Sequence, residues 1–190
     1  MFERLEQIIT LKKANIFEHY HTGIEKGKIE AEFRRLGLTP TEGLISLYQW
    51  HNGLKDWDIP TGISSIFPFG VFVALETAVK AYEELTEALE LVSPEYFPIL
   101  VEDCIIINLN SRMENYGSMF ILSPGMVIME PIKIYSSLTS FIETQIACYK
   151  KGVITFNKRG KRVIDFKKMR QLSKHLNPDC IYWQLESLPT

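Results

Sequence analysis

Two carboxylates flank a tryptophan at Asp56-Trp57-Asp58, in a stretch that follows Asn52-Gly53. Paired carboxylates can supply general acid/base catalysis, and beside an aromatic ring they can form a sugar site. A solvated loop with one anchoring tryptophan accounts for the same residues. No cofactor motif and no second catalytic pair accompanies them, so we favour the loop and expect no catalytic residues.

The histidines and cysteines indicate neither a metal site nor a reactive thiol. His19 and His21 are two residues apart, which on a helix places them on different faces. Cys104, Cys148 and Cys180 are odd in number, widely spaced and without a Cys-x-x-Cys pair, as in a reducing cytoplasm. Cys104 precedes a run of isoleucines and is interpreted as an inert core thiol.

Common catalytic motifs are absent from the sequence as well: it has no phosphate-binding Gly-rich loop with lysine, no Gly-x-Gly-x-x-Gly fingerprint and no nucleophile elbow. We therefore expect a protein that is not an enzyme, with no cofactor and no metal ion.

The charges are unevenly distributed along the chain. The total is 21 Lys+Arg against 23 Asp+Glu, or −2, which gives the whole molecule no strong bias toward nucleic acid or membrane. From Lys150 to Lys174, however, ten basic residues face a single acid, Asp165, so this segment carries +9 and the remainder −11. Phe156, Phe166 and Tyr182 are interleaved with it.

Three explanations of this basic segment stay open. We favour a solvated surface that partly neutralises the acidic body of the molecule. A protein partner ranks second. Nucleic acid, whose phosphates would make binding depend steeply on salt, ranks last.

Length and composition favour one α+β domain. The 190 residues, 46% of them hydrophobic and 23% charged, suit a single core and exclude a disordered or coiled-coil chain. We predict a mixed, mostly antiparallel sheet with helices packed around it over residues 1–150, and a basic C-terminal extension, 151–190, packed on or appended to that domain. The first residues carry charges where a signal peptide would be apolar, and no segment approaches the ~18 apolar residues of a membrane helix, so we expect a cytoplasmic protein without membrane contact. The oligomeric state is left open.

In the first half of the chain, apolar spacing predicts a helix from Phe2 to Tyr20 that ends at Gly23, and then a connection over 22–36 that includes a short helical piece. Thr39-Pro40-Thr41-Glu42 predicts the start of a second helix with Thr39 as its N-cap, and Asn52-Gly53 predicts its end. Short strands are predicted over 63–67 and 71–73, and an acidic amphipathic helix over 75–89.

In the second half, β-branched and aromatic runs predict consecutive antiparallel strands over 96–101, 104–109, 118–122 and 126–132, with a turn at Pro124-Gly125. The run from Cys104 to Ile107 lacks alternation and suits a central strand covered on both faces. A helix capped by Ser136 or Ser137 should follow over 138–149, then strands over 153–156 and 163–166, and a basic helix over 167–176 that stops at Asn177-Pro178.

The acidic helix is the best candidate for binding a partner. Its glutamates would steer a basic protein toward the chain, and an exposed tryptophan could supply a buried anchor. A glutamate-rich face is equally the mark of a soluble helix, and Trp50 lies close enough to a helix face to be core. The candidate partner-binding residues are Glu83, Glu84, Glu87, Glu90, Trp50, Trp57, Asp56 and Asp58.

Residues 38–53, Leu-Thr-Pro-Thr-Glu-Gly-Leu-Ile-Ser-Leu-Tyr-Gln-Trp-His-Asn-Gly, resemble the signature of the SUKH superfamily, which includes fungal cell-wall-assembly regulators and many bacterial immunity proteins. Tyr96-Phe97-Pro98-Ile99 before the strand at 104–109, and the helix that follows Ser136-Ser137, agree with that resemblance over about residues 38–149. The resemblance implies an α+β domain without catalytic residues that acts by binding proteins, most often by neutralising a competitor's toxin.

We therefore expect a non-enzymatic immunity protein that binds a cognate toxin, such as a basic nuclease, directly. The first alternative is a nucleic-acid-associated or cell-wall-synthesis regulatory protein that acts through the basic segment 150–175. The second is an enzyme built on Asp56 and Asp58. The sequence does not name the partner.

Overall fold

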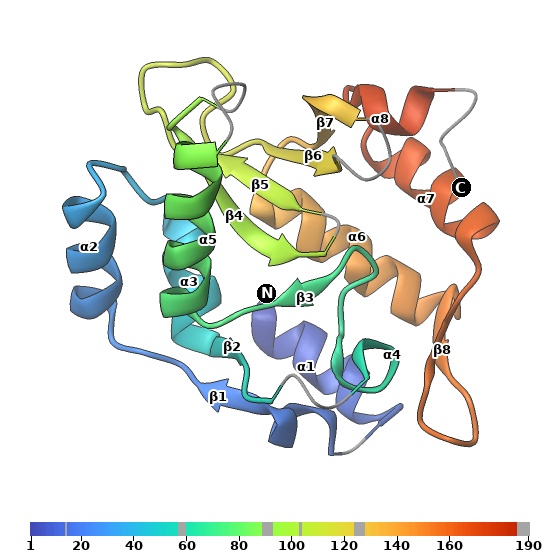
Figure 1. Cartoon of the computed structure of the whole chain (residues 1–190). Coiled ribbons are helices and arrows are strands. Elements are labelled where there is room, and N and C mark those ends of the chain that lie inside the picture. Colours follow the sequence, from blue (N-terminus) through green and yellow to red (C-terminus); the bar gives the residue numbers. More distant parts are fainter. Residues whose placement is uncertain (14, 57–59, 89–92, 103, 124–127, 186–190) are drawn as a thin grey trace.

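A computed structural model describes residues 1–13, 15–56, 60–88, 93–102, 104–123 and 128–185 (Figure 1). Helices pack against a five-stranded sheet whose strand order is β3-β4-β5-β6-β7, and each neighbouring pair is antiparallel. The predicted α+β fold is confirmed. The strands of this sheet are β3 (Val71–Phe72), β4 (Tyr96–Val101), β5 (Ile105–Asn108), β6 (Met119–Ser123) and β7 (Ile128–Tyr135).

The central strand, β5, is buried on both faces, as the unbroken apolar run predicts. Its residues alternate between the two sides of the sheet: Ile105 and Ile107 belong to the main core, whereas Ile106 packs with Phe120 and Leu122 in a second, smaller cluster. All four residues of β5 are buried. The predicted turn at Pro124-Gly125 lies outside the described residues.

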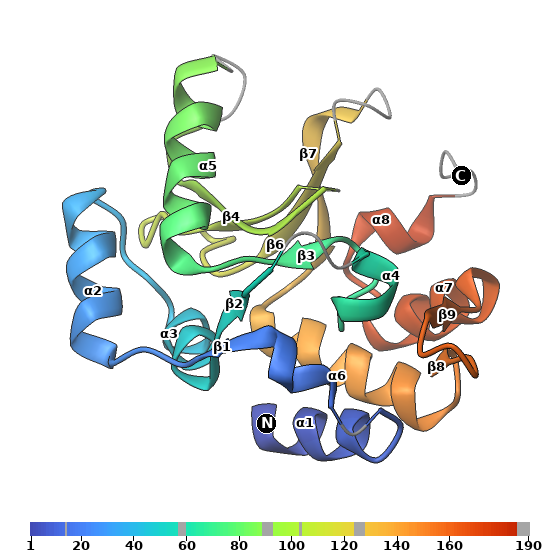
Figure 2. The same ribbon diagram turned by 60° about the horizontal axis from the view of Figure 1, so that its bottom comes forward.

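The helices cover the sheet mainly from one side, and Figure 2 shows α1, α3 and α6 beneath it. The cap of α6 is the predicted serine, since Ser137 and Ser140 bond to each other's backbone N–H groups in a capping box. The remaining elements are α1 (Phe2–Thr10), the 3-10 helix η1 (Ile16–His19), β1 (Tyr20–Thr22), α2 (Lys26–Arg35), α3 (Glu42–Trp50), β2 (His51–Leu54), α4 (Thr61–Ser64), α5 (Leu75–Ala88), α6 (Leu138–Lys150), β8 (Ile154–Phe156), β9 (Arg162–Ile164), α7 (Phe166–Leu176) and α8 (Ile181–Gln184).

The prediction of a long opening helix from Phe2 to Tyr20 was wrong beyond Thr10, where α1 ends. The chain bends there, and the Lys13 ammonium holds the bend by donating to the carbonyls of Ile63 and Gly160, 2.6 and 2.9 Å away. Ile16 and Tyr20 are still buried, but from η1 and β1. Helical spacing of apolar residues therefore identified the core residues of this segment, but these residues lie on three elements and not on one helix.

Of two further local predictions, one was incomplete and one was wrong. The connection predicted over 22–36, with a short helical piece, contains the ten-residue helix α2, which buries Ile29 and Phe33, four residues apart. The strand predicted over 63–67 is instead α4 and irregular backbone. Its polar groups are satisfied by side chains: the Tyr20 hydroxyl donates to the Ser64 carbonyl and accepts from the Ile66 N–H, so no partner strand is needed.

Helix α3 begins two residues later than predicted, because Thr41 rather than Thr39 is its N-cap. The Thr41 hydroxyl accepts from the Leu44 N–H at 3.2 Å. At the other end Asn52-Gly53 does not end the helix. The helix stops at Trp50, and both residues lie in β2, where Gly53 has the expected positive φ of 71°.

The Asn52-Gly53 pair positions α5. The Asn52 side-chain oxygen accepts a hydrogen bond at 2.8 Å from the N–H of Leu75, the first residue of α5. Gly53 permits this approach, because a Cβ there would lie 2.1 Å from backbone atoms of Val73 and Ala74. The pair therefore works as a tertiary contact between β2 and the start of α5.

The segment after residue 150 contributes to the same core as the rest of the chain. The Trp183 side chain is 1% exposed, and its indole N–H donates to the Ile134 carbonyl of β7 at 2.8 Å. The Arg162 guanidinium, from β9, donates to the carbonyls of Ser65 and Phe67. Strands β8 and β9 and helix α7 form close to their predicted positions, whereas the short helix α8 was not predicted.

Replacing Gly53 by alanine should destabilise the fold by about 3 kcal/mol or more. The new Cβ would overlap the backbone of Val73 and Ala74, and the alanine would also have to adopt a left-handed backbone conformation. Gly37 is the matched control: it has the same φ of 71°, but nothing lies within 4 Å of its added Cβ. Gly37→Ala should therefore cost only about 1 kcal/mol. Urea unfolding of both variants measures the difference, and equal losses would contradict the close contact.

Trp183→Ala should destabilise the protein by about 3–5 kcal/mol, since it removes a buried ring and its hydrogen bond. Ile181, on the same helix, is 58% exposed, so Ile181→Ala should change stability by no more than about 0.5 kcal/mol. Thermal and urea unfolding test both. A Trp183→Ala protein as stable as Ile181→Ala would show that the last helix is dispensable for the core.

Candidate functional site

Helix α5 is held against the sheet and presents its acidic side to solvent. The ring of Phe97 on β4 lies 5.8 Å from the ring of Tyr82 on α5 and 4.7 Å from Phe33 on α2. Ala78 and Val79 are also buried. The opposite side of α5 is exposed and carries Glu76, Lys80, Glu83, Glu84 and Glu87, hereafter the acidic face.

The acidic face has an excess of three negative charges, four glutamates against Lys80. One glutamate is already engaged, because Glu83 forms an ion pair with Arg35 of α2, 3.2 Å away. Both side chains of that pair are about half exposed, so it contributes little to stability. Glu84 and Glu87 are exposed on the same helix, whereas the predicted Glu90 lies outside the described residues.

A groove of about 330 Å³ runs between α5 and the β4–β5 turn, and the sequence did not predict it. Two carboxylates, Glu84 from the helix and Glu102 from the turn, line it together with apolar side chains. We call it the α5 groove. Its other lining residues are Ala81, Leu85, Pro98, Val101 and Cys104.

The turn that forms one wall of the α5 groove has an unusual backbone. Glu102 and Cys104 have positive φ angles of 84° and 44°, in the region that L-residues rarely adopt. Each such residue costs on the order of 1–3 kcal/mol, and it persists only where the surroundings determine the backbone. The position of Glu102 at the groove is therefore imposed by the packing of β4 and β5.

The Cys104 thiol adds no reactivity to the groove. Burial raises the pKa of this thiol to about 11, so very little thiolate exists near neutral pH. The side chain is one of the partly buried groups beside the Ile106 cluster. It serves as a small apolar lining group, as the interpretation of an inert thiol predicted.

The structure places Trp50 away from the α5 groove, in an aromatic cluster near the N-terminus. Its ring stacks on Phe2 with centroids 5.2 Å apart and meets Phe17 edge-on at 5.5 Å. Its indole N–H donates to the Glu6 carboxylate. The ring is therefore used for internal packing, and we leave it out of the candidate site.

His51 belongs to the same cluster. It stacks on Phe17 with centroids 5.1 Å apart, and its Nε2 lies 3.6 Å from the Glu6 carboxylate. Asp56 is exposed, while Trp57 and Asp58 lie outside the described residues, so the pairing of the two carboxylates stays a prediction. Among the described residues, no three His, Cys, Asp or Glu side chains gather as metal ligands would.

No family model matches the chain, and no curated protein sequence matches it. Within the described part of the chain, no helix is long and apolar enough to cross a membrane. The site therefore rests on its own geometry.

Sequence reasoning missed the α5 groove because each wall is ordinary by itself. Ala81 is one of several small helix residues, and Pro98 is one of several apolar residues in a strand. Only their tertiary apposition leaves space between them. The nearest sequence signals for a groove are two residues. Pro98 cannot donate a backbone hydrogen bond, and Ala81 is too small to fill a gap.

Native Cys104 should react with iodoacetamide at pH 8 at least about tenfold more slowly than an unstructured peptide cysteine. The raised pKa lowers its thiolate fraction about 100-fold, and the greater nucleophilicity of a more basic thiolate recovers only part of that. The rate should rise as the pH approaches the pKa. Peptide mass spectrometry follows it, with the fully buried Cys148 and Cys180 as internal controls; a peptide-like rate at pH 8 would contradict an inert thiol.

Proposed function

We propose that this chain is a SUKH-type, non-enzymatic binding domain, an immunity protein that neutralises a basic toxin, such as a nuclease, by direct contact. The observation that carries the proposal is the α5 groove. Its lining is mostly apolar, with the carboxylates of Glu84 and Glu102, and the acidic face borders it. The partner it suits is a protein surface with an apolar side chain flanked by lysines or arginines.

The arrangement has the anatomy of a protein interface. Such interfaces combine an apolar centre, where most of the binding energy lies, with a polar rim. Ala81, Leu85 and Pro98 supply the apolar centre, and the two groove carboxylates supply the rim. A glutamate-rich helix alone would not make this case, because glutamate is depleted at interface centres.

The charge of the acidic face would act mainly on the speed of association. Exposed charges of one sign steer an oppositely charged partner and raise the association rate constant, while salt screens the effect. Glu84 and Glu87 are free of any ion pair with the other described residues, whereas Glu83 is paired with Arg35. We therefore assign the steering to Glu84 and Glu87 and give Glu83 a lesser part.

The order of elements supports the SUKH assignment. A proline-led helix (α3), the Asn52-Gly53 pair, the strand that starts at Tyr96 and the serine-capped α6 follow one another as the resemblance implies. Asn52 bonds to the start of α5. In this chain the resembling segment therefore orients the helix on which the proposed site depends.

Reversing two charges in Glu84→Lys/Glu87→Lys should weaken binding to the toxin at least tenfold, chiefly through a slower association rate, and the loss should shrink at high salt. The protein to test is the product of the neighbouring gene, since an immunity protein is expected beside its toxin; binding is measured by surface plasmon resonance with a growth-rescue assay. Glu25→Lys/Glu114→Lys changes the same charge at exposed sites elsewhere and should bind like the parent.

Filling the groove tests the apolar part separately. Ala81→Arg adds a long side chain at a half-buried helix position and keeps a good helix former, so the fold should persist. It should speed dissociation at least tenfold while melting temperature and circular dichroism stay close to the parent. Full toxin neutralisation by both the Ala81→Arg and the charge-reversed proteins would refute the α5 groove as the binding site.

A further inference from the structure

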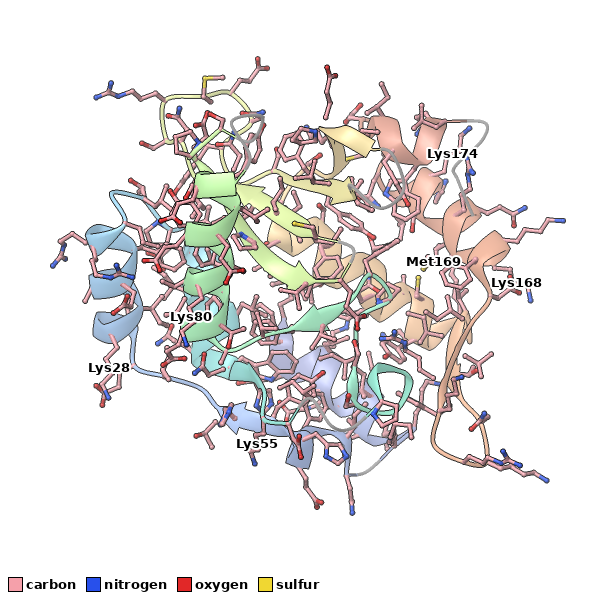
Figure 3. All side chains as sticks on the ribbon, viewed as in Figure 1. Lys28, Lys55, Lys80, Lys168, Met169 and Lys174 are labelled. Atoms are coloured by element: carbon pink, nitrogen blue, oxygen red, sulfur yellow. The ribbon has the colours of Figure 1, made fainter. Side chains whose placement is uncertain are left out.

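The basic segment lies on the far side of the molecule from α5. It consists of the β8–β9 hairpin and α7, which follow each other directly in the chain (Figure 1). Figure 3 shows Lys168 and Lys174 projecting outward from α7, with Lys28 and Lys80 at the opposite side. We call this surface the basic C-terminal face; its cations are Lys158, Arg159, Lys161, Lys167, Lys168, Arg170 and Lys174.

Most cations of this face are exposed to solvent. Among the described residues, the ion pair that they form is Lys168 with Asp165, 3.1 Å apart and within the same segment. Six of the seven side chains are exposed, and Arg170 is half-buried. The explanation favoured from the sequence, partial neutralisation of the acidic body, is supported by the electrostatic attraction between Arg162 of the basic segment and Glu102. Arg162 is not one of the cations of the basic C-terminal face, which leaves those cations available to a partner.

Helix α7 uses its apolar side internally and its basic side externally. Met169 and Ser173 are buried, and Leu172 packs partly against the core. Lys167, Arg170 and Lys174 recur at three- and four-residue spacing, which aligns them along one side of the helix over about 10 Å. This row of cations follows the line that a polyanionic backbone would take.

An aromatic ring stands at the head of this row. Phe166, the first residue of α7, is 62% exposed and is followed at once by Lys167 and Lys168. Val163, 47% exposed, comes just before it on β9. An exposed ring among cations is the combination with which proteins bind single strands, because bases stack on the ring while phosphates meet the charges.

We propose that the basic C-terminal face binds single-stranded nucleic acid, with Phe166 as a stacking surface and the lysines and arginines along the phosphates. A bilayer fits less well, because a membrane-surface helix buries its apolar side in lipid, and α7 has already packed that side against the core. An acidic protein would use the charges alone and not the Phe166 ring as a base-stacking surface, and competition by polyglutamate tests it. This inference is independent of the toxin proposal and uses none of its residues.

The test is fluorescence anisotropy with a labelled 20-nucleotide strand, as RNA and as DNA of the same sequence, from 25 to 200 mM salt. Binding should weaken steeply, with a slope of log affinity against log salt of about −3 to −5 for four to seven phosphate contacts. The DNA and RNA arms show which sugar is preferred. The duplex of the same sequence should bind at least about fivefold more weakly than the strand.

Two variants and a matched control separate the parts of the proposal. Lys167→Glu/Lys174→Glu should lose at least tenfold in affinity at 50 mM salt and flatten the salt slope by about 1.4. Phe166→Ala should lose about fivefold or more on the single strand and little on the duplex. Lys28→Glu/Lys55→Glu makes the same charge change on α2 and just after β2 and should lose less than twofold.

Four outcomes would overturn the proposal. They are no binding at 25 mM salt, equal losses in the two double variants, complete competition by polyglutamate at equal charge, and tighter binding to vesicles of 70% phosphatidylcholine and 30% phosphatidylserine than to the strand. Toxin binding by the Lys167→Glu/Lys174→Glu protein should equal the parent's, so failure here is distinguishable from failure of the α5 groove.

Discussion

The contact between β2 and the start of α5 constrains everything that we assign to the α5 side of the molecule. The Asn52 side-chain oxygen accepts a hydrogen bond from the N–H of Leu75, the first residue of α5. Gly53 lets the backbone of β2 approach that of Val73 and Ala74 more closely than any Cβ would permit. Because α5 then packs on β4 through Tyr82 and Phe97, the helix has one orientation relative to the sheet. The acidic face and the α5 groove are both consequences of that orientation.

The net charge of −2 conceals two surfaces of opposite sign on opposite sides of one core. Both helices involved bury an apolar stripe, α5 with Ala78 and Val79 and α7 with Met169, and so both show their charged side to solvent. The two helices differ in what lies beside them, and this decides which kind of partner each suits. Beside α5 there is an apolar groove, which suits a protein, whereas α7 has an exposed ring and a row of cations, which suit a phosphate backbone.

The local sequence pattern was enough to predict an element correctly where its ends and its buried face depend on residues of that element alone. Strand β4 spans the predicted residues 96–101, α5 and α6 start where their apolar stripes start, and β5 is buried on both faces as its unbroken run indicates. The pattern failed where a distant partner intervened. Lys13 bends the first helix by binding carbonyls from residues 63 and 160, and Tyr20 replaces a strand partner at 64–66.

The sequence by itself determined the α+β class, most strands, the acidic and basic helices and the isolation of the cysteines, because periodicity, turn residues and charge are local properties. It also contained Asn52-Gly53, but not its role. Only the tertiary structure decided that this pair holds α5, that Trp50 packs against the core, that Trp183 ties the last helix to β7, and that Ala81 and Pro98 line the same groove. Each of these depends on two segments far apart in the chain meeting at a distance that no local pattern specifies.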